Sequence, residues 1–445
     1  MEKSRISRKH FLKNTGLSLA GMAFIPGLIQ AQSTKLQENN TKTTGKTYTL
    51  KNVRLETGFE FEKEEVVATQ TDLFCVEIEN GKIKKISPNQ PDVSAIDAAG
   101  MLMLPSFKDM HIHLDKTLYA DKWRAVRRSG GIKGMISLEQ RTLREMLKNS
   151  TCKAQKLIEL LQEKGTGFAR SHVNIEPTSK LDSLKNLEKA LASKKNGFDA
   201  ELVAFPQHGL YYTDSLPFMK EAAKMDIDFI GGLDPTNVDG SIERTMDTTI
   251  QLALDHNKGI DIHLHESGKS GHDTIEYLIA KVNENTVLKG KTYVSHAFAL
   301  GTLEKNQQEA IAEKLAAAQI GIISTIPFGG LVMPIPVLLK HGVNVMTGND
   351  SIVDYWSTMG SGSVLQKANL AAQLYGQVSE FGLSRMLKLA TAGTIPLDDQ
   401  GVQQWPKAGD DANMVLIDAS CSAEAVSRIS PVKSLIYQGN IVYKN

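Results

Sequence analysis

The stretch Lys108–Thr117, KDMHIHLDKT, carries two histidines one residue apart at the end of an apolar run. A β-strand places residues i and i+2 on the same face, so His111 and His113 would point toward one spot if this run is a strand. Two such imidazoles are either half of a metal site or simply two polar residues at a strand end. The residues further along the chain discriminate between these two interpretations.

Seven further apolar, β-type runs follow this one, and stretches with helical composition separate them, such as SLKNLEKALASKK and LEKNQQEAIAEKLAAA. Alternating strands and helices predict a parallel sheet. Eight strands predict an α/β fold of the (β/α)8 barrel type, which we place at 105–400. A doubly wound open sheet is the alternative, but no GxGxxG follows the first strand. The eight predicted strands are 101–115, 167–175, 199–207, 226–234, 259–266, 291–298, 321–326 and 343–350.

Both ends of the chain beyond the barrel read as short strands. Residues 47–104 contain TYTLKNVRL and LFCVEIENGKIKKI, and the Asn80-Gly81 pair is typical of a tight hairpin. Residues 401–445 contain ANMVLIDA, VKSLIYQGN and IVYKN, with Gly439 in a turn. Chain termini often lie close together, so we expect the two segments to form one small β-sandwich.

The first 46 residues differ in composition from all of this. Residues 1–31 have a basic start and then an apolar run, GLSLAGMAFIPGLI, which is too short to span a bilayer comfortably. The stretch SRKHFLK resembles the twin-arginine export signal, with Lys9 in place of the second arginine. We therefore expect an exported, periplasmic protein without a stable membrane span in its mature form. The alternatives are an ordinary secretory signal or an uncleaved amphipathic helix, and a cytoplasmic location if the signal does not function. Residues 32–46, polar and without apolar period, are interpreted as a linker.

Composition excludes several classes of function. There are 51 Lys and Arg residues against 50 Asp and Glu residues, which gives no reason to expect nucleic acid as a partner. The three cysteines are widely spaced and form no CxxC pair, so a zinc-finger type of site is not expected. One disulfide stays open as an alternative to three separate thiols.

Polar residues gather at the ends of the predicted strands, where a barrel carries its active site. Neutral imidazoles and carboxylates that converge there bind a zinc- or iron-like ion with an open position for water. Such an ion lowers the pKa of its water, and a neighbouring carboxylate can move the proton. The strand-end residues are His111, His113, Asp115, His172, Gln207, His208, Asp234, His263, His265, Glu266, His296, Asn349 and Asp350.

The order of these residues resembles the amidohydrolase superfamily, in particular its cytosine deaminase-like branch. The resemblance rests on PSFKDMHIHLDKT, RSHVNIEP, ELVAFPQHG, DIHLHESG, YVSHAFAL and TGNDSIVDYW, in this order, and covers roughly residues 47 to 445. It implies a (β/α)8 barrel with a β-sandwich built from both chain ends, and a metal-dependent amidohydrolase or deaminase that acts on carbon–nitrogen bonds other than peptide bonds.

The resemblance also implies roles for single residues. His111, His113, His263 and Asp350 would bind one divalent metal ion, zinc or iron in the first place and manganese in the second. Glu266 would be the proton shuttle for attack by metal hydroxide, and His296 would hydrogen-bond the hydroxide or the developing oxyanion. Asp350 would also accept a proton from the water, and Gln207 would bind the substrate ring.

Two features limit how far these roles extend. Spacing alone would make His265 a ligand as well, but the family pattern has an aspartate there, so we expect His265 to contact substrate or to support the site. The fourth predicted strand ends in FIGGLDP, without the lysine that bridges two metals in some amidohydrolases, so a single metal is expected. His172, Asp234, Asn349 and Ser351 receive no role.

The substrate class is left open by the loops that shape the pocket. Ser351 stands where cytosine deaminases have an acidic residue, and Asn349 where they have a histidine. We expect a small nitrogen-containing substrate, with deamination of a heterocycle first and hydrolysis of a cyclic or acyclic amide, or of an N-substituted ring, second. A non-catalytic metal-binding protein of the envelope is the alternative from another class. A homo-oligomer is compatible with the sequence.

Overall fold

The computed structural model describes residues 47–90, 94–126 and 130–445. The predicted export signal at 1–31 and the linker at 32–46 lie outside these residues. Within the described part of the chain, no helix combines the length and apolar character needed to cross a membrane. All three cysteines are free thiols, two of them buried and Cys152 exposed.

Eight parallel strands form one sheet in strictly sequential order, as the alternation of strands and helices predicts. Each of the eight overlaps one of the apolar runs in the sequence. The strands are β6 (Phe107–Ile112), β7 (Thr166–Asn174), β8 (Asp199–Phe205), β9 (Phe229–Leu233), β10 (Gly259–His263), β11 (Thr292–Ser295), β12 (Ile320–Ser324) and β13 (Val345–Thr347). Every residue of β9, β10 and β12 is buried, which is typical of parallel strands covered on both faces.

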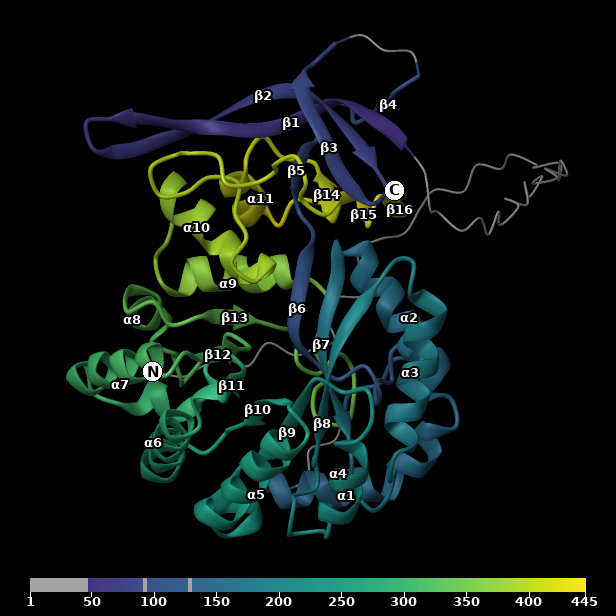
Figure 1. Ribbon diagram of the computed structural model, residues 1–445, viewed down its shortest axis with the longest axis vertical. Coiled ribbons are helices and arrows are strands. Elements are labelled where there is room, and N and C mark those ends of the chain that lie inside the picture. The colour runs from purple at the N-terminus through teal and green to yellow at the C-terminus, as the bar shows by residue number, and fades with distance from the viewer. Residues whose placement is uncertain (1–46, 91–93, 127–129) are drawn as a thin grey trace, which may run out of the picture. The chain divides into compact units, whose positions relative to one another are not determined.

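Helices connect these strands, and Figure 1 shows α2, α3, α5, α6 and α7 on the outer side of the sheet. Helix α5 illustrates why they form: Ser241 caps its first turn by accepting a hydrogen bond from the backbone of Arg244, and Met246, Ile250 and Ala253 make a buried stripe. The helices are α1 (Gly131–Leu147), α2 (Ser150–Glu163), α3 (Asp182–Lys194), α4 (Leu216–Ala222), α5 (Ile242–Asp255), α6 (Gly268–Glu284), α7 (Lys305–Ala317), α8 (Ile335–Lys340), α9 (Val364–Leu374), α10 (Glu380–Thr391) and α11 (Ser422–Arg428), with short turns η1 (Pro235–Asp239), η2 (Thr286–Leu288) and η3 (Phe298–Thr302).

The barrel closes where β13 meets β6. The backbone N–H of Asp350 donates to the carbonyl of His111 at 2.7 Å, and the N–H of His113 donates to the carbonyl of Asp350 at 3.3 Å. A Cβ atom on Gly348 would lie 2.4 Å from the backbone of His111, so only glycine permits this approach. Closure therefore places Asp350 directly beside the histidine pair of the first strand.

Strands from both ends of the chain form a second, separate sheet, as the fold class predicts (Figure 1, purple and yellow). Asn80 and Gly81 form its tight hairpin with positive φ at both residues. The chain leaves this sheet at Pro105 and enters the barrel at Phe107. The strands are β1 (Thr47–Glu62), β2 (Glu65–Glu79), β3 (Lys82–Pro88), β4 (Ile96–Asp97), β5 (Leu102–Pro105), β14 (Met414–Ile417), β15 (Val432–Tyr437) and β16 (Asn440–Lys444).

Candidate active site

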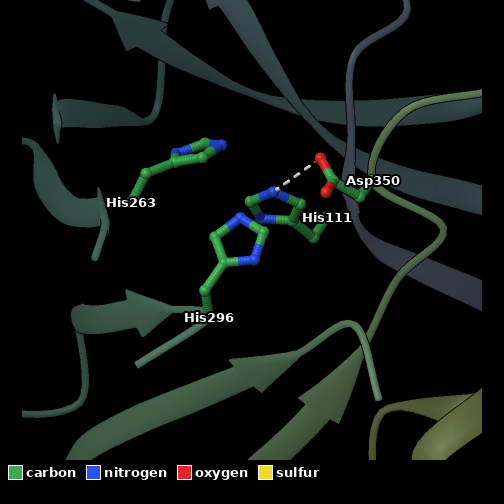
Figure 2. Close-up of side chains that lie close together, drawn as sticks. All are labelled: His111, His263, His296 and Asp350. Atoms are coloured by element: carbon green, nitrogen blue, oxygen red, sulfur yellow. Dashed lines mark ion pairs between the residues drawn. The ribbon is translucent and has the colours of Figure 1, made fainter. Parts of the chain in front are cut away.

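Four side chains from four different strands converge at the carboxyl end of the barrel, as Figure 2 shows. His111 lies in β6, His263 ends β10, His296 follows β11 and Asp350 follows β13. Each offers one potential ligand atom, and these four atoms all lie within 4.8 Å of one another. His111 Nε2 is 3.5 Å from Asp350 Oδ1. Segments separated by up to 239 positions thus contribute to one compact group.

His113 adjoins the same group. Its Nε2 lies 3.4 Å from Asp350 Oδ1 and 3.3 Å from His263 Nε2. The structure therefore brings together all four residues that the sequence predicts as ligands, and His296 lies among them. The ring of His172 lies tilted against that of His111, with the centroids 4.3 Å apart, and meets that of His263 edge to face, with the centroids 4.5 Å apart.

The donor atoms of this group fit a divalent cation. His111 Nε2 and both ring nitrogens of His296 are buried without a hydrogen-bond partner among the described residues. Burial, reinforced by neighbouring imidazoles, holds the pKa of His263 and His296 well below the usual range, and burial together with the Lys116 charge lowers the pKa of His113 to about 4. Neutral imidazoles beside a carboxylate are the donor set that zinc and iron prefer.

A chain of polar contacts at Nδ1 orients the ring of His111. Its Nδ1 lies 2.9 Å from the Ser295 hydroxyl oxygen, and that hydroxyl donates to Asp261 Oδ1 at 2.7 Å. Arg170 donates to the other oxygen of Asp261 at 3.0 Å, between the rings of Phe229 and Tyr293. Such outer contacts fix the ring so that Nε2 faces the group.

A second set of hydrogen bonds joins strand β6, which carries His111, to the residues after β13 that include Asp350. The buried carboxylate of Asp109 accepts from the backbone N–H of Asn349 at 3.0 Å and from its side-chain amide at 2.7 Å. Asn349, which the sequence left without a role, thus ties β13 to β6 next to both potential ligands.

Glu266 uses one carboxylate oxygen as an anchor and leaves the other without a partner. Its Oε1 accepts backbone hydrogen bonds from Thr236 and Asn237, both at 2.7 Å, at the start of η1. Its Oε2 is buried with no partner among the described residues. Burial raises the pKa of Glu266 above that of an ordinary glutamate. A fixed carboxyl with a raised pKa suits a group that takes up and releases a proton.

His265 stands at the rim of the site. Asp234 Oδ2 lies 3.0 Å from its Nδ1, and Asp234 Oδ1 accepts from its backbone N–H at 2.6 Å. Burial opposes protonation, but the Asp234 carboxylate prevails and raises the pKa of His265. Its side chain is 33% exposed, so it can meet a ligand, and Asp234 orients it.

Three residues of the site have left-handed backbone conformations. His296 has φ 67°, Asp350 has φ 64° and Asp234 has φ 35°. Residues with a Cβ rarely adopt positive φ, and such strain concentrates at functional sites.

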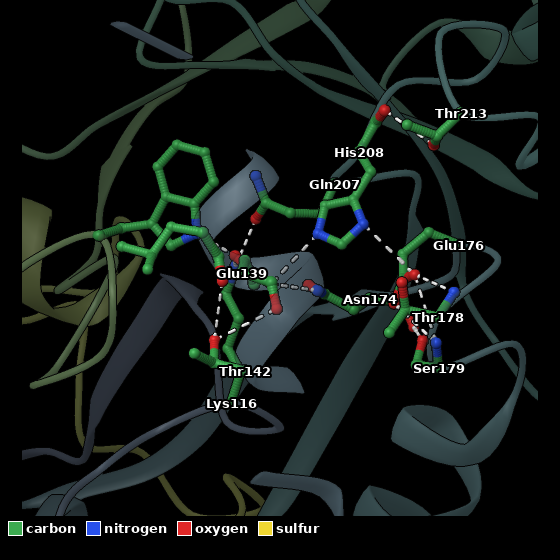
Figure 3. Close-up of polar contacts among 12 residues, drawn as sticks. Lys116, Glu139, Thr142, Asn174, Glu176, Thr178, Ser179, Gln207, His208 and Thr213 are labelled. Carbon is green, nitrogen blue, oxygen red and sulfur yellow. Dashed lines mark hydrogen bonds and ion pairs between the residues drawn. The ribbon is translucent and has the colours of Figure 1, made fainter. Parts of the chain in front are cut away.

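Figure 3 shows a buried network of charged groups around Glu139, and the charge of Lys116 in this network acts on His113. Lys116 donates to Gln207 Oε1 and lies 3.5 Å from Glu139 Oε2. Glu139 also accepts from the Trp356 indole, and its Oε1 lies 3.7 Å from His208 Nε2. The predicted substrate-binding Gln207 is thus held by Lys116, which leaves its amide N–H groups for other partners.

The network holds His208 in the charged form. Burial disfavours a charged imidazole, but Glu139 and Glu176 lie on opposite sides of His208 and raise its pKa to about 9. Burial likewise disfavours ionised Glu139, yet Lys116 and His208 hold its pKa well below the usual range. Opposite charges therefore alternate through the network.

Several of these residues escaped the sequence analysis. Ser295 precedes a predicted site residue directly, and Lys116 follows the histidine pair, so their positions carried a signal. Glu139 lies on α1 and is 1% exposed, but nothing in its sequence neighbourhood distinguishes it from surface glutamates.

The chain is similar to known proteins over most of its length. The sequence model of the amidohydrolase family, Amidohydro_3, matches residues 153–443. An uncharacterized protein of Escherichia coli K12, YahJ, is 47% identical over 99% of both chains. N-isopropylammelide isopropyl amidohydrolase of Pseudomonas sp. strain ADP is 24% identical over 79% of this chain and 88% of its own.

Solved structures agree with these sequence relatives. N-isopropylammelide isopropylaminohydrolase from Burkholderia multivorans superposes with a TM-score of 0.78 and 26% identity, over 90% of this chain and 98% of the other. 5-Methylcytosine deaminase from Klebsiella pneumoniae, bound to phosphonocytosine, gives a TM-score of 0.75 and 25% identity over 89% and 98%.

Proposed function

Because this chain belongs to the amidohydrolase family, whose members are generally metal-dependent hydrolases of carbon–nitrogen bonds, we propose that it deaminates a nitrogen heterocycle. The observation that carries the proposal is the position of Glu266. One of its oxygens is anchored by two backbone amides, and the other is buried without a partner among the described residues, three positions after His263 in the chain. A storage site for metal does not need such a carboxyl.

His111, His113, His263 and Asp350 would hold one divalent cation, with zinc or iron favoured by the imidazole donors and manganese as a further candidate. When bound, such a cation supplies a Lewis acid that makes water nucleophilic near neutral pH. His111 is kept in place for this task by Ser295 and Asp261.

The side chains of the chain itself would move the protons. Glu266 takes a proton from the attacking water at Oε2 and delivers it to the leaving nitrogen, while the water oxygen bonds to the ring carbon and the carbon–nitrogen bond breaks. Asp350 accepts the second proton of the water, which then passes to the adjacent ring nitrogen, so that the products are the ring carbonyl compound and ammonia. Neutral His296 hydrogen-bonds the oxygen that develops on the attacked carbon, and Gln207 and His265 contact the ring.

Release of a substituted amine from the ring is the second candidate. Its support is the similarity to the two N-isopropylammelide amidohydrolases, together with the size of the cavity beside Asp350, described below. Ammonia and a substituted amine leave from the same position, so both candidates use the same residues.

A product screen tests the proposal. Purified protein loaded in turn with zinc, iron or manganese is incubated with a panel of heterocyclic amines, N-alkylamino rings and cyclic amides, and released ammonia or amine is measured. We expect turnover with at least one amine-bearing ring and about one metal ion per chain. Protein that retains no metal after any preparation would contradict the proposal, and so would a panel without product.

The variant Glu266→Gln sharpens this test. We expect its metal content to match the wild type while turnover falls by about 10²- to 10⁴-fold, which is the usual contribution of a general acid–base group. Glu145→Gln, exposed on α1 and paired with Lys148, is the matched control and should retain full activity. Unchanged turnover in Glu266→Gln would exclude the shuttle role.

The proposal includes export. The basic start and apolar run of 1–31 support a twin-arginine-like signal and a periplasmic location. Fractionation of cells that produce the full chain tests this, and recovery from the cytoplasm alone would contradict it.

A further inference from the structure

A cavity of about 900 Å³ opens beside Asp350. The loops after β12 and β13 and the side chains of α9 line it, including Phe328, Met359, Lys367 and Leu370. The Asp350 side chain is 33% exposed, whereas the side chains of His111 and His113 are almost fully buried. A ligand in this cavity can therefore reach Asp350, the one potential metal ligand that lines it.

The cavity offers more room than a single six-membered ring occupies. Its volume lies at the upper end of the range for sites that enclose a whole drug-sized ligand. Phe328 and Met359 are 69% and 76% exposed, so large apolar surfaces stand at the cavity without cover from the described residues. A ring bound at Asp350 would thus leave space for a substituent.

Lys367 places a positive charge in the wall of this cavity. Its ammonium donates to the carbonyl of Thr325 at 2.9 Å. Among the described residues, its ammonium forms no ion pair with a carboxylate, although an ammonium has three hydrogens to donate. Burial lowers the pKa of Lys367, while Asp350 and Asp109 act in the opposite direction from a distance. A largely buried cation without a direct counter-ion is costly, and a bound anion would compensate it.

We propose that the substrate carries a carboxylate, which Lys367 binds in this cavity while the ring lies at Asp350. This inference rests on the proposed function, because it places the reacting ring at the group around Asp350. One lysine matches one negative charge. Apart from Asp350, where the ring would lie, the other polar side chains of the lining are hydroxyls and amides. A phosphate dianion would call for further cations or a bidentate arginine, and the lining contains neither. The substrate class is therefore a nitrogen heterocycle or cyclic amide with a carboxylate substituent.

Calorimetric binding to the metal-loaded protein tests this inference without turnover. The probes are uracil and three carboxylated forms with different reach: 5-carboxyuracil, orotate and uracil-1-acetic acid. We expect at least one acid to bind about 10- to 100-fold more tightly than uracil, which is the contribution of a charge-assisted hydrogen bond. If no acid binds more tightly than uracil, the inference is overturned. Tighter binding of uridine 5′-phosphate than of every acid would overturn it as well.

Three variants assign the preference to Lys367. Lys367→Met should bind the favoured acid as weakly as uracil and leave uracil binding unchanged, and Lys367→Arg should keep part of the preference. Lys258→Met is the matched control, because Lys258 also donates to backbone carbonyls, those of Met225 and Ile227, but directly precedes β10 at the opposite end of the barrel. An undiminished preference in Lys367→Met would overturn the assignment.

The two proposals fail in different ways. A preference for the acid without product from any ring would contradict the proposed deamination and leave the carboxylate site in place. Turnover of rings without any preference for the acid would overturn the carboxylate site and leave deamination in place.

Discussion

The histidines at the mouth of the barrel fall into two environments with opposite charge states. His263 and His296 are buried among other imidazoles, and their pKa values are held well below the usual range. His208 is equally buried, but the carboxylates of Glu139 and Glu176 flank it and raise its pKa to about 9. Burial is the same in both places, so the neighbours decide the charge.

This difference separates two kinds of task. Neutral imidazoles with unpartnered nitrogens can bind a cation, and they crowd around a single carboxylate, Asp350. The charged imidazole of His208 has no nitrogen to spare, because each faces a carboxylate in a network that ends at Lys116 and Gln207. The first environment is built for a ligand, and the second holds other side chains in position.

The largest effect is expected from Asp350→Asn, which removes the only carboxylate of the group of potential ligands. We expect loss of bound metal and a fall in turnover of about 10³-fold or more, since several kcal/mol of charge stabilisation disappear. Metal analysis and product release measure both. Asp255→Asn, exposed on α5, is the control. Full metal content in Asp350→Asn would mean that the histidines bind the metal without a carboxylate.

The variant Glu139→Ala breaks the buried network of charged groups. It leaves the positive charges of Lys116 and His208 without the carboxylate that both of them face. We expect the free energy of unfolding to fall by about 3–5 kcal/mol, as for other buried ion pairs that lose one partner. Denaturant titration measures this fall. Glu145→Ala on the same helix, exposed to solvent, should change stability by less than about 0.5 kcal/mol. Equal effects of both variants would show that the network contributes nothing.

A smaller effect is expected from Ser295→Ala, which removes the hydroxyl behind His111 and leaves all potential ligands in place. Loss of such an outer contact weakens metal binding by about 10- to 100-fold. Competition with a chelator measures the affinity. Ser295→Thr keeps a hydroxyl and should restore most of the affinity, a recovery that general destabilisation of the strand would not produce.

A further expected effect concerns pH. The folded-state pKa of His208 is raised from about 6.5 to about 9, so its stabilisation is complete below pH 6.5 and is lost as pH rises through 9. The stability difference between wild type and His208→Gln should therefore shrink over this interval, with a slope of at most about 1.4 kcal/mol per pH unit. Denaturant titration at several pH values measures it, with His272→Gln on α6 as control. A difference that stays constant up to pH 10 would mean that His208 is neutral.

Much of the fold follows from local patterns. Each of the eight barrel strands is an apolar run that a helical stretch separates from the next, and the Asn80-Gly81 hairpin has the composition that such turns require. The potential ligands could be predicted as a set for the same reason, because parallel strands in a barrel bring their carboxyl ends to one place. Their proposed roles remain for experiment.

The contacts that support the site could not be predicted in this way. Asp109 and Asn349 are 240 positions apart, and Ser295 lies 184 positions from His111. In the sequence, Glu139 and Lys367 look like ordinary surface residues of helices. Only the packing of α1 and α9 against the barrel shows that both side chains face inward.

The sequence by itself determined which strands form and what each strand end offers, since apolar period and residue type are local properties. Only the tertiary structure decided the charge of each histidine and the partner of each lysine. Those depend on burial and on neighbours from distant segments, such as Glu139 and Glu176 around His208 or the Thr325 carbonyl at Lys367. Charge in a buried site is a property of the whole fold, because the interior offers little solvent to replace a missing partner.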